Sequence, residues 1–142
     1  MALDGRALRV LVVEDDDGDA MMIAEALEAV ASPATVWRVT DGEQALARLR
    51  AGGAAARPDV ILLDLNMPRM DGRETLTEIK RDDDLRAIPV VILTTSDDVR
   101  DILQTYRGHA NAFVTKPMNF DALESVVQSI RRFYEETAVL PT

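Results

Sequence analysis

Three carboxylates in this sequence stand where buried strands are expected to end. Glu14 and Asp15 come directly after the predicted strand 9–13, which is apolar from residue 10, and Asp64 comes directly after the predicted strand 59–63, which is apolar from residue 60. Short apolar runs rich in β-branched residues are typical of strands buried in a parallel sheet. Because ligands in such sheets bind at the carboxyl ends of neighbouring strands, we expect the three side chains to converge on one small site.

The convergence of three like charges has a chemical consequence. Each carboxylate raises the proton affinity of the others unless a cation shares the site. Carboxylate oxygens with room for water suit Mg²⁺, so Glu14, Asp15 and Asp64 are candidate magnesium ligands. A single acid at a strand end is equally well explained as a solvated residue or a helix cap, and it is the convergence that favours a metal site.

Two more side chains on the same predicted edge suit an anion. Thr94 ends the apolar run 90–93, and its hydroxyl and the nearby backbone N–H groups are candidate ligands for phosphate oxygens. Lys116 follows the short run 112–114, and its ammonium is a candidate partner for an anion beside Asp64. Alone, either residue would be interpreted as an ordinary strand-end or surface side chain.

The aspartates that follow Asp15 are interpreted differently. Asp16, Asp17 and Asp19 stand at the start of a predicted helix, where acids cap free N–H groups and complement the helix dipole. We therefore interpret these three as caps and surface residues and leave them out of the predicted site.

The elements that must position these residues alternate along the chain. Strands are expected at 9–13, 36–39, 59–63, 90–93 and 112–114. Helical spacing of apolar residues follows each of them, at Ile23, Leu27 and Val30, at Ala45, Leu46 and Leu49, at Leu76 and Ile79, at Ile102, Leu103 and Tyr106, and at Leu123, Val126, Val127 and Ile130. Five strand–helix pairs predict an α/β fold, a flavodoxin-like (βα)5 doubly wound parallel sheet with strand order 2-1-3-4-5.

The composition restricts the class of protein. The chain has 142 residues, of which 47% are hydrophobic and 29% charged, and this balance predicts one globular domain. It has no cysteine and only His109 as histidine, so chemistry must use carboxylates rather than thiolates or histidine clusters. The net charge of −9 disfavours nucleic-acid binding. We expect a cytoplasmic protein without a membrane segment, because no apolar run is long enough and no signal-peptide pattern is present.

Four segments together resemble the receiver domain of two-component response regulators. The segments are Val13-Glu14-Asp15-Asp16, Leu63-Asp64-Leu65-Asn66-Met67-Pro68-Arg69-Met70-Asp71-Gly72, Leu93-Thr94-Thr95-Ser96 and Val114-Thr115-Lys116-Pro117. They match in order and at the correct strand ends, and the expected receiver domain covers residues 1–134. Glu14 stands where the family most often has aspartate, a frequent variation that keeps a carboxylate for the metal.

The resemblance implies a phosphoacceptor and a metal site. Asp64 would accept a phosphoryl group from a phosphohistidine of a sensor histidine kinase. Mg²⁺ would be held by Glu14, Asp15, Asp64 and the backbone carbonyl of Asn66. A carboxylate is a competent nucleophile toward phosphorus, and a metal neutralises charge on the transferring oxygens, so the implied chemistry is sound.

The resemblance also implies a conformational switch. Thr94 and Lys116 would contact the phosphoryl group, and Phe113 would be an aromatic switch residue whose ring follows the Thr94 hydroxyl. The alternative for Phe113 is a plain core aromatic. Such a protein is not an enzyme acting on a separate substrate. It catalyses its own phosphorylation and dephosphorylation and acts as a single-domain, phosphorylation-controlled interaction switch or relay.

The C-terminal segment resembles that of the small response regulators of bacterial and cyanobacterial phytochromes, as do the Leu-Thr-Thr-Ser and Asn-Met-Pro segments. This implies a phytochrome as the kinase and a homodimer formed through the last helix and the tail, residues 135–142. A dimer would cover apolar side chains at this end, namely Phe133, Tyr134, Val139, Leu140 and Pro141. The alternative is a tail that packs back on its own domain or lacks fixed structure.

Three other functions are weighed against this one. A pseudo-receiver binding module would share the fold without phosphorylation, and the complete set of predicted site residues argues against it. A metal-dependent phosphatase with an aspartyl nucleophile would need a substrate cap or a second catalytic acid, and Asn66 stands near Asp64 instead. A DNA-binding regulator would need an output domain, and only a short tail follows the last predicted helix.

Overall fold

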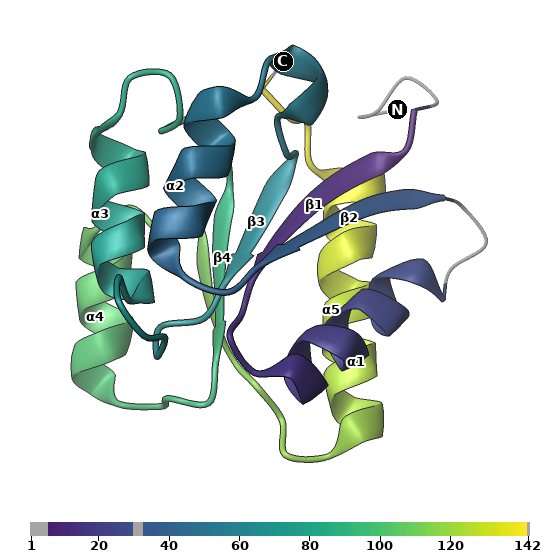
Figure 1. Ribbon diagram of the computed structural model, residues 1–142. Helices are drawn as coiled ribbons and strands as arrows, with labels where there is room; N and C mark the ends of the chain where they lie inside the picture. The colour runs from purple at the N-terminus through teal and green to yellow at the C-terminus, as the bar shows by residue number, and fades with distance from the viewer. Residues whose placement is uncertain (1–5, 30–32, 142) are drawn as a thin grey trace.

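The computed structural model describes residues 6–29 and 33–141, which form one central sheet with helices on both faces (Figure 1). The expected Val30 position in the first helix lies outside the described residues. In chain order the elements are β1 (Leu8–Val13), α1 (Asp17–Glu28), β2 (Ala34–Val39), α2 (Gly42–Ala51), a short 3-10 turn (Ala54–Ala56), β3 (Val60–Leu63), α3 (Gly72–Arg81), β4 (Val90–Thr94), α4 (Val99–Arg107), β5 (Ala112–Thr115) and α5 (Phe120–Arg132).

The sheet has the predicted topology. Its five strands are all parallel, in the order β2-β1-β3-β4-β5. Helices α1 and α5 cover one face, and α2, α3 and α4 cover the other (Figure 1). Val13 and Leu63 are register partners at the ends of β1 and β3, so the residues that follow them lie side by side at one edge of the sheet. The flavodoxin-like fold class is confirmed.

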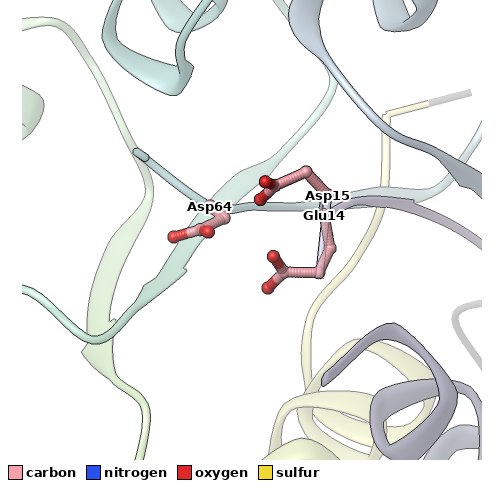
Figure 2. A group of neighbouring side chains, drawn as sticks. All are labelled: Glu14, Asp15 and Asp64. Atoms are coloured by element: carbon pink, nitrogen blue, oxygen red, sulfur yellow. The ribbon is translucent and has the colours of Figure 1, made fainter. Parts of the chain in front are cut away.

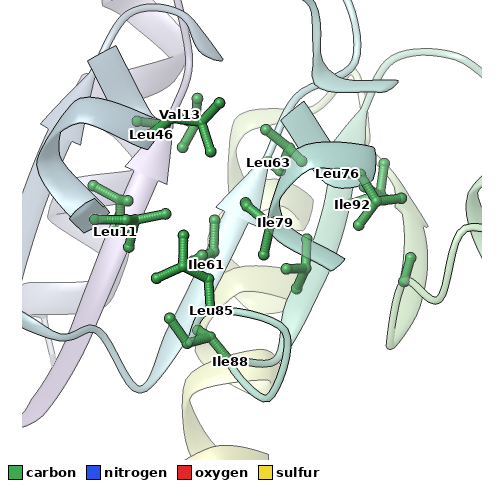
Figure 3. Close-up of a cluster of buried hydrophobic side chains, with 14 of the residues drawn as sticks. Leu11, Val13, Leu46, Ile61, Leu63, Leu76, Ile79, Leu85, Ile88 and Ile92 are labelled. Carbon is green, nitrogen blue, oxygen red and sulfur yellow. The ribbon is translucent and has the colours of Figure 1, made fainter. Parts of the chain in front are cut away.

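Strand side chains fill a core on each face of the sheet. Leu11, Val13, Ile61 and Leu63 point toward α2 and α3 (Figure 3). The intervening strand residues, among them Val10, Val12 and Leu62, pack on the other face with Ile23 of α1 and Val127 of α5. Burial on both faces explains why β1, β3 and β4 have nearly continuous apolar runs in sequence rather than alternating patterns.

Helix α4 packs less deeply than its sequence pattern predicts. Leu103 and Tyr106 were expected on its apolar face but are 47% and 49% exposed, whereas Thr105 is the buried residue of the described helix. The hydrogen-bonding capacity of the buried Thr105 hydroxyl is satisfied within the helix, because the hydroxyl donates to backbone carbonyls of the preceding turn. The predicted apolar face of this helix is therefore wrong for two of its residues.

The end of the chain also differs from the expected tail without helical structure. A π-helical turn, Phe133–Thr137, continues α5, and the Ala138 N–H closes it on the Phe133 carbonyl at 2.8 Å. Tyr134 and Leu140 are buried in the core beside α1 and α5, whereas Phe133 is 50% and Val139 91% exposed. The expectation that this end leaves its apolar residues uncovered is thus wrong for Tyr134 and Leu140.

A buried cation fastens α5 to the end of α1. The Arg131 guanidinium donates to the carbonyl oxygens of Leu27 and Pro33 and pairs with Glu135 at 2.9 Å. These acceptors belong to chain segments about a hundred positions away from Arg131 and to the turn that follows it.

In the part of the chain that the structure describes, no helix has both the length and the apolarity to cross a bilayer.

Candidate functional site

The structure brings Glu14, Asp15 and Asp64 together at the carboxyl ends of β1 and β3 (Figure 2). One carboxylate oxygen of each lies within 4.8 Å of the others. Glu14 and Asp64 are buried, whereas Asp15 is exposed. The cluster is therefore rooted in the fold and open to solvent through Asp15, as an exchangeable hard cation requires.

The backbone around the two buried acids is fixed by strand pairing that continues one residue past each strand. The Glu14 N–H donates to the Val39 carbonyl, and the Asp64 N–H donates to the Val13 carbonyl, both at 3.1 Å. The Asp64 carboxylate is oriented as well, since its Oδ1 accepts the Leu65 N–H at 2.8 Å. This bond leaves Oδ2 as the oxygen directed toward Lys116.

Lys116 places a buried ammonium among the carboxylates. Its Nζ hydrogen-bonds to Glu14, lies 3.0 Å from Asp19 Oδ2 and lies 3.7 Å from Asp64 Oδ2. Its backbone is fixed too, because the Lys116 N–H donates to the Thr94 carbonyl at 2.6 Å. The residues from the ends of β1, β3, β4 and β5 thus form one connected site.

The electrostatics of this site favour added positive charge. Burial raises the pKa of Glu14 to about 7, the nearby Asp64 carboxylate acts in the same direction, and the hydrogen bond from Lys116 opposes both. Burial alone would lower the pKa of Lys116, but Glu14, Asp64 and Asp19 together hold it above its usual value. Both groups therefore bind protons more tightly than usual, which is the behaviour of a negative cluster suited to a cation.

Asp19 belongs to this site, which contradicts its interpretation as a helix cap or surface residue. Asp16 is the N-cap of α1 and accepts the Asp19 N–H at 2.8 Å, and Asp17 pairs with Arg38 at 2.8 Å. The Asp19 side chain instead turns to Lys116. A helix needs only one N-cap, so Asp17 and Asp19 are not needed as caps once Asp16 serves. This could have indicated from the sequence that Asp19 has another role.

Thr94 and Phe113 lie on the neighbouring strands β4 and β5. Thr94 is fully buried, and its hydroxyl oxygen accepts the Ser96 N–H at 3.4 Å. Phe113 is partly buried and packs against the core on the α2–α3 face, and its backbone N–H donates to the Tyr106 hydroxyl at 3.1 Å. The hydroxyl and the aromatic ring thus occupy adjacent strands, and their roles as a switch stay a prediction.

The loop between β3 and α3 passes very close to the Asp64 backbone. A Cβ on Gly72 would lie 2.1 Å from the Asp64 carbonyl oxygen and 2.7 Å from the Leu65 Cα. Glycine is required here by close approach, rather than for the permissive backbone conformation that glycine usually supplies. Asn66 is exposed in this loop, and the part of its carbonyl in metal binding stays a prediction.

The same loop is tied to the start of α2. Arg69 has a left-handed φ of 61°, which is uncommon outside glycine, and its guanidinium bonds to buried Asp41. Asp41 also caps α2 through the Gln44 N–H, and this bond, assisted by Arg69, holds the pKa of Asp41 below its usual range despite burial. The Gly42 N–H donates to the Met70 carbonyl at 3.0 Å and completes the tie.

Comparison with known proteins assigns this chain to one family. The model of the response regulator receiver domain matches residues 10–128. Response regulator Rcp1 of Synechocystis sp. is 42% identical over 135 residues, covering 93% of this chain and 92% of Rcp1. A second relative, "Probable methanogenesis regulatory protein FilR2" of Methanothrix harundinacea, is 40% identical over 127 residues, covering 88% of this chain and 82% of FilR2.

Solved structures agree with the sequence relatives. The phosphorylated cyanobacterial phytochrome response regulator RcpA superposes with a TM-score of 0.91 at 44% identity, covering 96% of this chain and all of RcpA. The Mn²⁺-bound form of Rcp1 superposes with a TM-score of 0.87 at 40% identity, covering 95% of this chain and 99% of Rcp1. The resemblance that the four sequence segments indicate is confirmed, and the chain belongs to the response regulator receiver domain family.

Proposed function

We propose that this chain is a phosphorylation switch in which Asp64 accepts a phosphoryl group from a phosphohistidine of a sensor histidine kinase in the cytoplasm. One observation carries the proposal. The Asp64 carboxylate shares a site with two further carboxylates, and a buried ammonium lies 3.7 Å from its Oδ2. A nucleophilic carboxylate, cation ligands and a fixed positive charge are the parts that phosphoryl transfer requires.

In the proposed transfer, Asp64 Oδ2 attacks phosphorus because Oδ1 is engaged by the Leu65 N–H. A P–O bond forms while the P–N bond to the donor imidazole breaks, and its electron pair returns to the imidazole nitrogen. Bound Mg²⁺, held by Glu14, Asp15, Asp64 and the Asn66 carbonyl, would supply positive charge to the phosphoryl oxygens. Dephosphorylation at the same site would be attack of water on phosphorus, which returns Asp64 as a carboxylate and releases inorganic phosphate.

Lys116 and Thr94 connect the proposed phosphoryl group to the rest of the fold. Lys116 supplies a second positive charge from β5, and its backbone is bonded to Thr94 at the end of β4. A phosphoryl oxygen that accepts a hydrogen bond from the Thr94 hydroxyl would pull that side chain away from Ser96. The space that Thr94 leaves would then favour an inward position of Phe113, and the state of β4 and β5 would follow the state of Asp64.

The surface beside Lys116 fits a protein phosphodonor. A cleft of about 310 Å³ is lined by Asp19 and Lys116 and also by Met118 and Phe120, which are exposed. Exposed apolar side chains next to a charged reaction centre suit the docking of another protein rather than a small phosphodonor alone. Because RcpA is a phytochrome response regulator, we propose a phytochrome-type histidine kinase as the donor.

Transfer of labelled phosphate tests this function directly. The wild type and Asp64→Asn are incubated with a phosphorylated phytochrome kinase and, separately, with acetyl phosphate, each with Mg²⁺ and with EDTA. We expect label on the wild type only and only with Mg²⁺. No label on the wild type from any donor would favour a binding module that is not phosphorylated, and label on Asp64→Asn would mean that another residue is the phosphoacceptor. Label from acetyl phosphate but not from the phytochrome kinase would reject only the choice of kinase.

We also propose a homodimer formed through α5 and the tail. Its interface would use the apolar side chains that a single chain leaves exposed at this end. Phe133 and Val139 are such residues, whereas Leu140 serves the core of its own domain. Light scattering of Phe133→Ser/Val139→Ser against the wild type, with and without beryllofluoride, tests this. Met21→Ser, an exposed change on α1, is the control. A wild type that stays monomeric at micromolar concentration in both states would rule out the dimer.

A further inference from the structure

Three carboxylates surround the Lys116 ammonium, and the proposed reaction would engage two of them. Two of its three neighbours, Glu14 and Asp64, are also the buried members of the metal cluster. When a cation and a phosphoryl group engage those two, Asp19 is the carboxylate that remains for Lys116. A buried ammonium without a partner is costly, so this remaining contact matters.

Asp19 is well placed to hold Lys116 in one position. It lies in the first turn of α1, its backbone N–H is engaged by the Asp16 cap, and its Oδ2 lies 3.0 Å from Lys116 Nζ. The two residues are 97 positions apart in sequence. The ion pair therefore joins α1 to the end of β5 directly beside the proposed phosphoacceptor.

The resulting position of the ammonium suits a phosphoryl oxygen rather than the bare carboxylate. Nζ lies 3.7 Å from Asp64 Oδ2, beyond the usual hydrogen-bond range. A phosphoryl group attached to Oδ2 would place its own oxygens farther from Asp64 and within reach of Nζ. If Lys116 instead closed on Asp64, it would occupy the oxygen that must attack phosphorus and would neutralise the carboxylate that helps to hold the metal.

We propose that Asp19 is a positioning residue for Lys116: it holds the ammonium away from Asp64, so that Asp64 stays open to the cation and the phosphoryl group. This inference rests on the proposed phosphorylation of Asp64. Loss of the Asp19 carboxylate is expected to weaken Mg²⁺ binding and to slow phosphorylation, because Lys116 would then pair with Asp64 and block both.

The test uses Asp19→Asn with Asp17→Asn as a matched control. Asp17 lies in the same helical turn and carries the same charge, but it is 89% exposed and pairs with Arg38 instead of Lys116. Mg²⁺ affinity is measured by NMR titration, phosphorylation by the initial rate with acetyl phosphate, and the Lys116 position by the ¹⁵N shift of its ammonium without metal.

We expect Asp19→Asn to lower Mg²⁺ affinity and the phosphorylation rate by about tenfold, and Asp17→Asn to change either by less than about twofold. The Lys116 shift should move only in the first variant, and Asp19→Glu should restore part of the rate. Equal effects of the two variants, or an unmoved Lys116 shift, would overturn the proposal.

A double-mutant cycle separates positioning from a direct effect of the lost charge on the metal. If Asp19 acts through Lys116, Asp19→Asn has less than about a twofold effect on Mg²⁺ affinity when Lys116 is already alanine. An undiminished effect in the Lys116→Ala background would mean that Asp19 attracts the cation directly, and the proposal would fail. Failure of the proposed function looks different, since the wild type itself would then take up no phosphate on Asp64.

Discussion

The Arg69 guanidinium donates two hydrogen bonds, at 2.8 and 2.5 Å, to a single oxygen of the buried Asp41 carboxylate. The pair joins the loop that follows Asp64 to the N-terminus of α2. It holds Arg69 in a left-handed backbone conformation that costs free energy in a residue other than glycine. Removal of the charge on Asp41 should therefore affect both α2 and the loop.

We expect Asp41→Asn to destabilise the protein at pH 7 by about 1–2 kcal/mol, because asparagine offers one acceptor oxygen where the carboxylate uses two, one for the Gln44 N–H and one for Arg69. The folded pKa of Asp41 lies below the ordinary value of 3.8, so the folded state binds this proton more weakly than the unfolded state. The stabilisation is therefore present above about pH 4 and is lost as the pH falls through the folded pKa. Urea unfolding from pH 7 down to pH 3 should show the difference from wild type narrowing. Asp83→Asn, at a side chain that is 87% exposed, is the control and should change stability little at any pH.

Gly72→Ala should damage both the fold and the site. The new Cβ would meet backbone atoms of Asp64 and Leu65, which cannot yield like the end of a flexible side chain. We expect a loss of about 2–3 kcal/mol in unfolding free energy and a marked loss of phosphorylation at Asp64. Gly53→Ala is the matched control, because among the described residues no atom lies within 4 Å of its added Cβ and its φ of −81° suits alanine. Similar stability of the two variants would show that the loop shifts freely.

Glu14→Gln/Asp15→Asn should abolish Mg²⁺-dependent phosphorylation while leaving the metal-free protein as stable as wild type or more stable. Repulsion among three carboxylates is removed, and Lys116 keeps Asp19 at 3.0 Å and Asp64 at 3.7 Å as partners. Thermal unfolding in EDTA measures the sign. A clear loss of stability would instead mean that these acids serve mainly to hold the fold together.

Lys116→Ala should retain some phosphorylation but lose much of the conformational response. Mg²⁺ would still stabilise the phosphoryl group, whereas the charged link from Asp64 to β5 is absent. Amide chemical-shift changes on addition of beryllofluoride should shrink for β5 and α4. A full wild-type pattern of changes in this variant would show that the response travels by another route.

The strand ends were the most predictable part of this molecule. Runs that are buried on both faces are continuous in sequence, so the ends of β1, β3 and β4 and the side chains that follow them could be located. The parallel topology then required Glu14, Asp15 and Asp64 to meet at one edge. Local sequence and one topological rule sufficed for this part of the site.

The contacts that were missed depend on distances between segments far apart in sequence. Nothing local to Asp19 shows that Lys116 lies 3.0 Å away, and nothing local to Tyr106 shows that its hydroxyl reaches the Phe113 N–H. The spacing of Leu140 in the tail has no helical or strand period, yet the side chain fills a place in the core. Such contacts are set by the packing of whole elements, which sequence periodicity does not specify.

The shallow packing of α4 has a thermodynamic consequence. Arg73 and Ser96 both bond to Asp101 on this helix, and Tyr106 bonds to β5, so directional polar contacts rather than buried apolar area fasten it. A small shift of α4 would be enough to break these bonds, and it would expose little new apolar surface. The heat-capacity change of a transition follows the apolar area that it exposes, so movement of α4 should have almost no heat-capacity change. Its amides should accordingly exchange with solvent through openings of low free energy, well before those of α1 or α5.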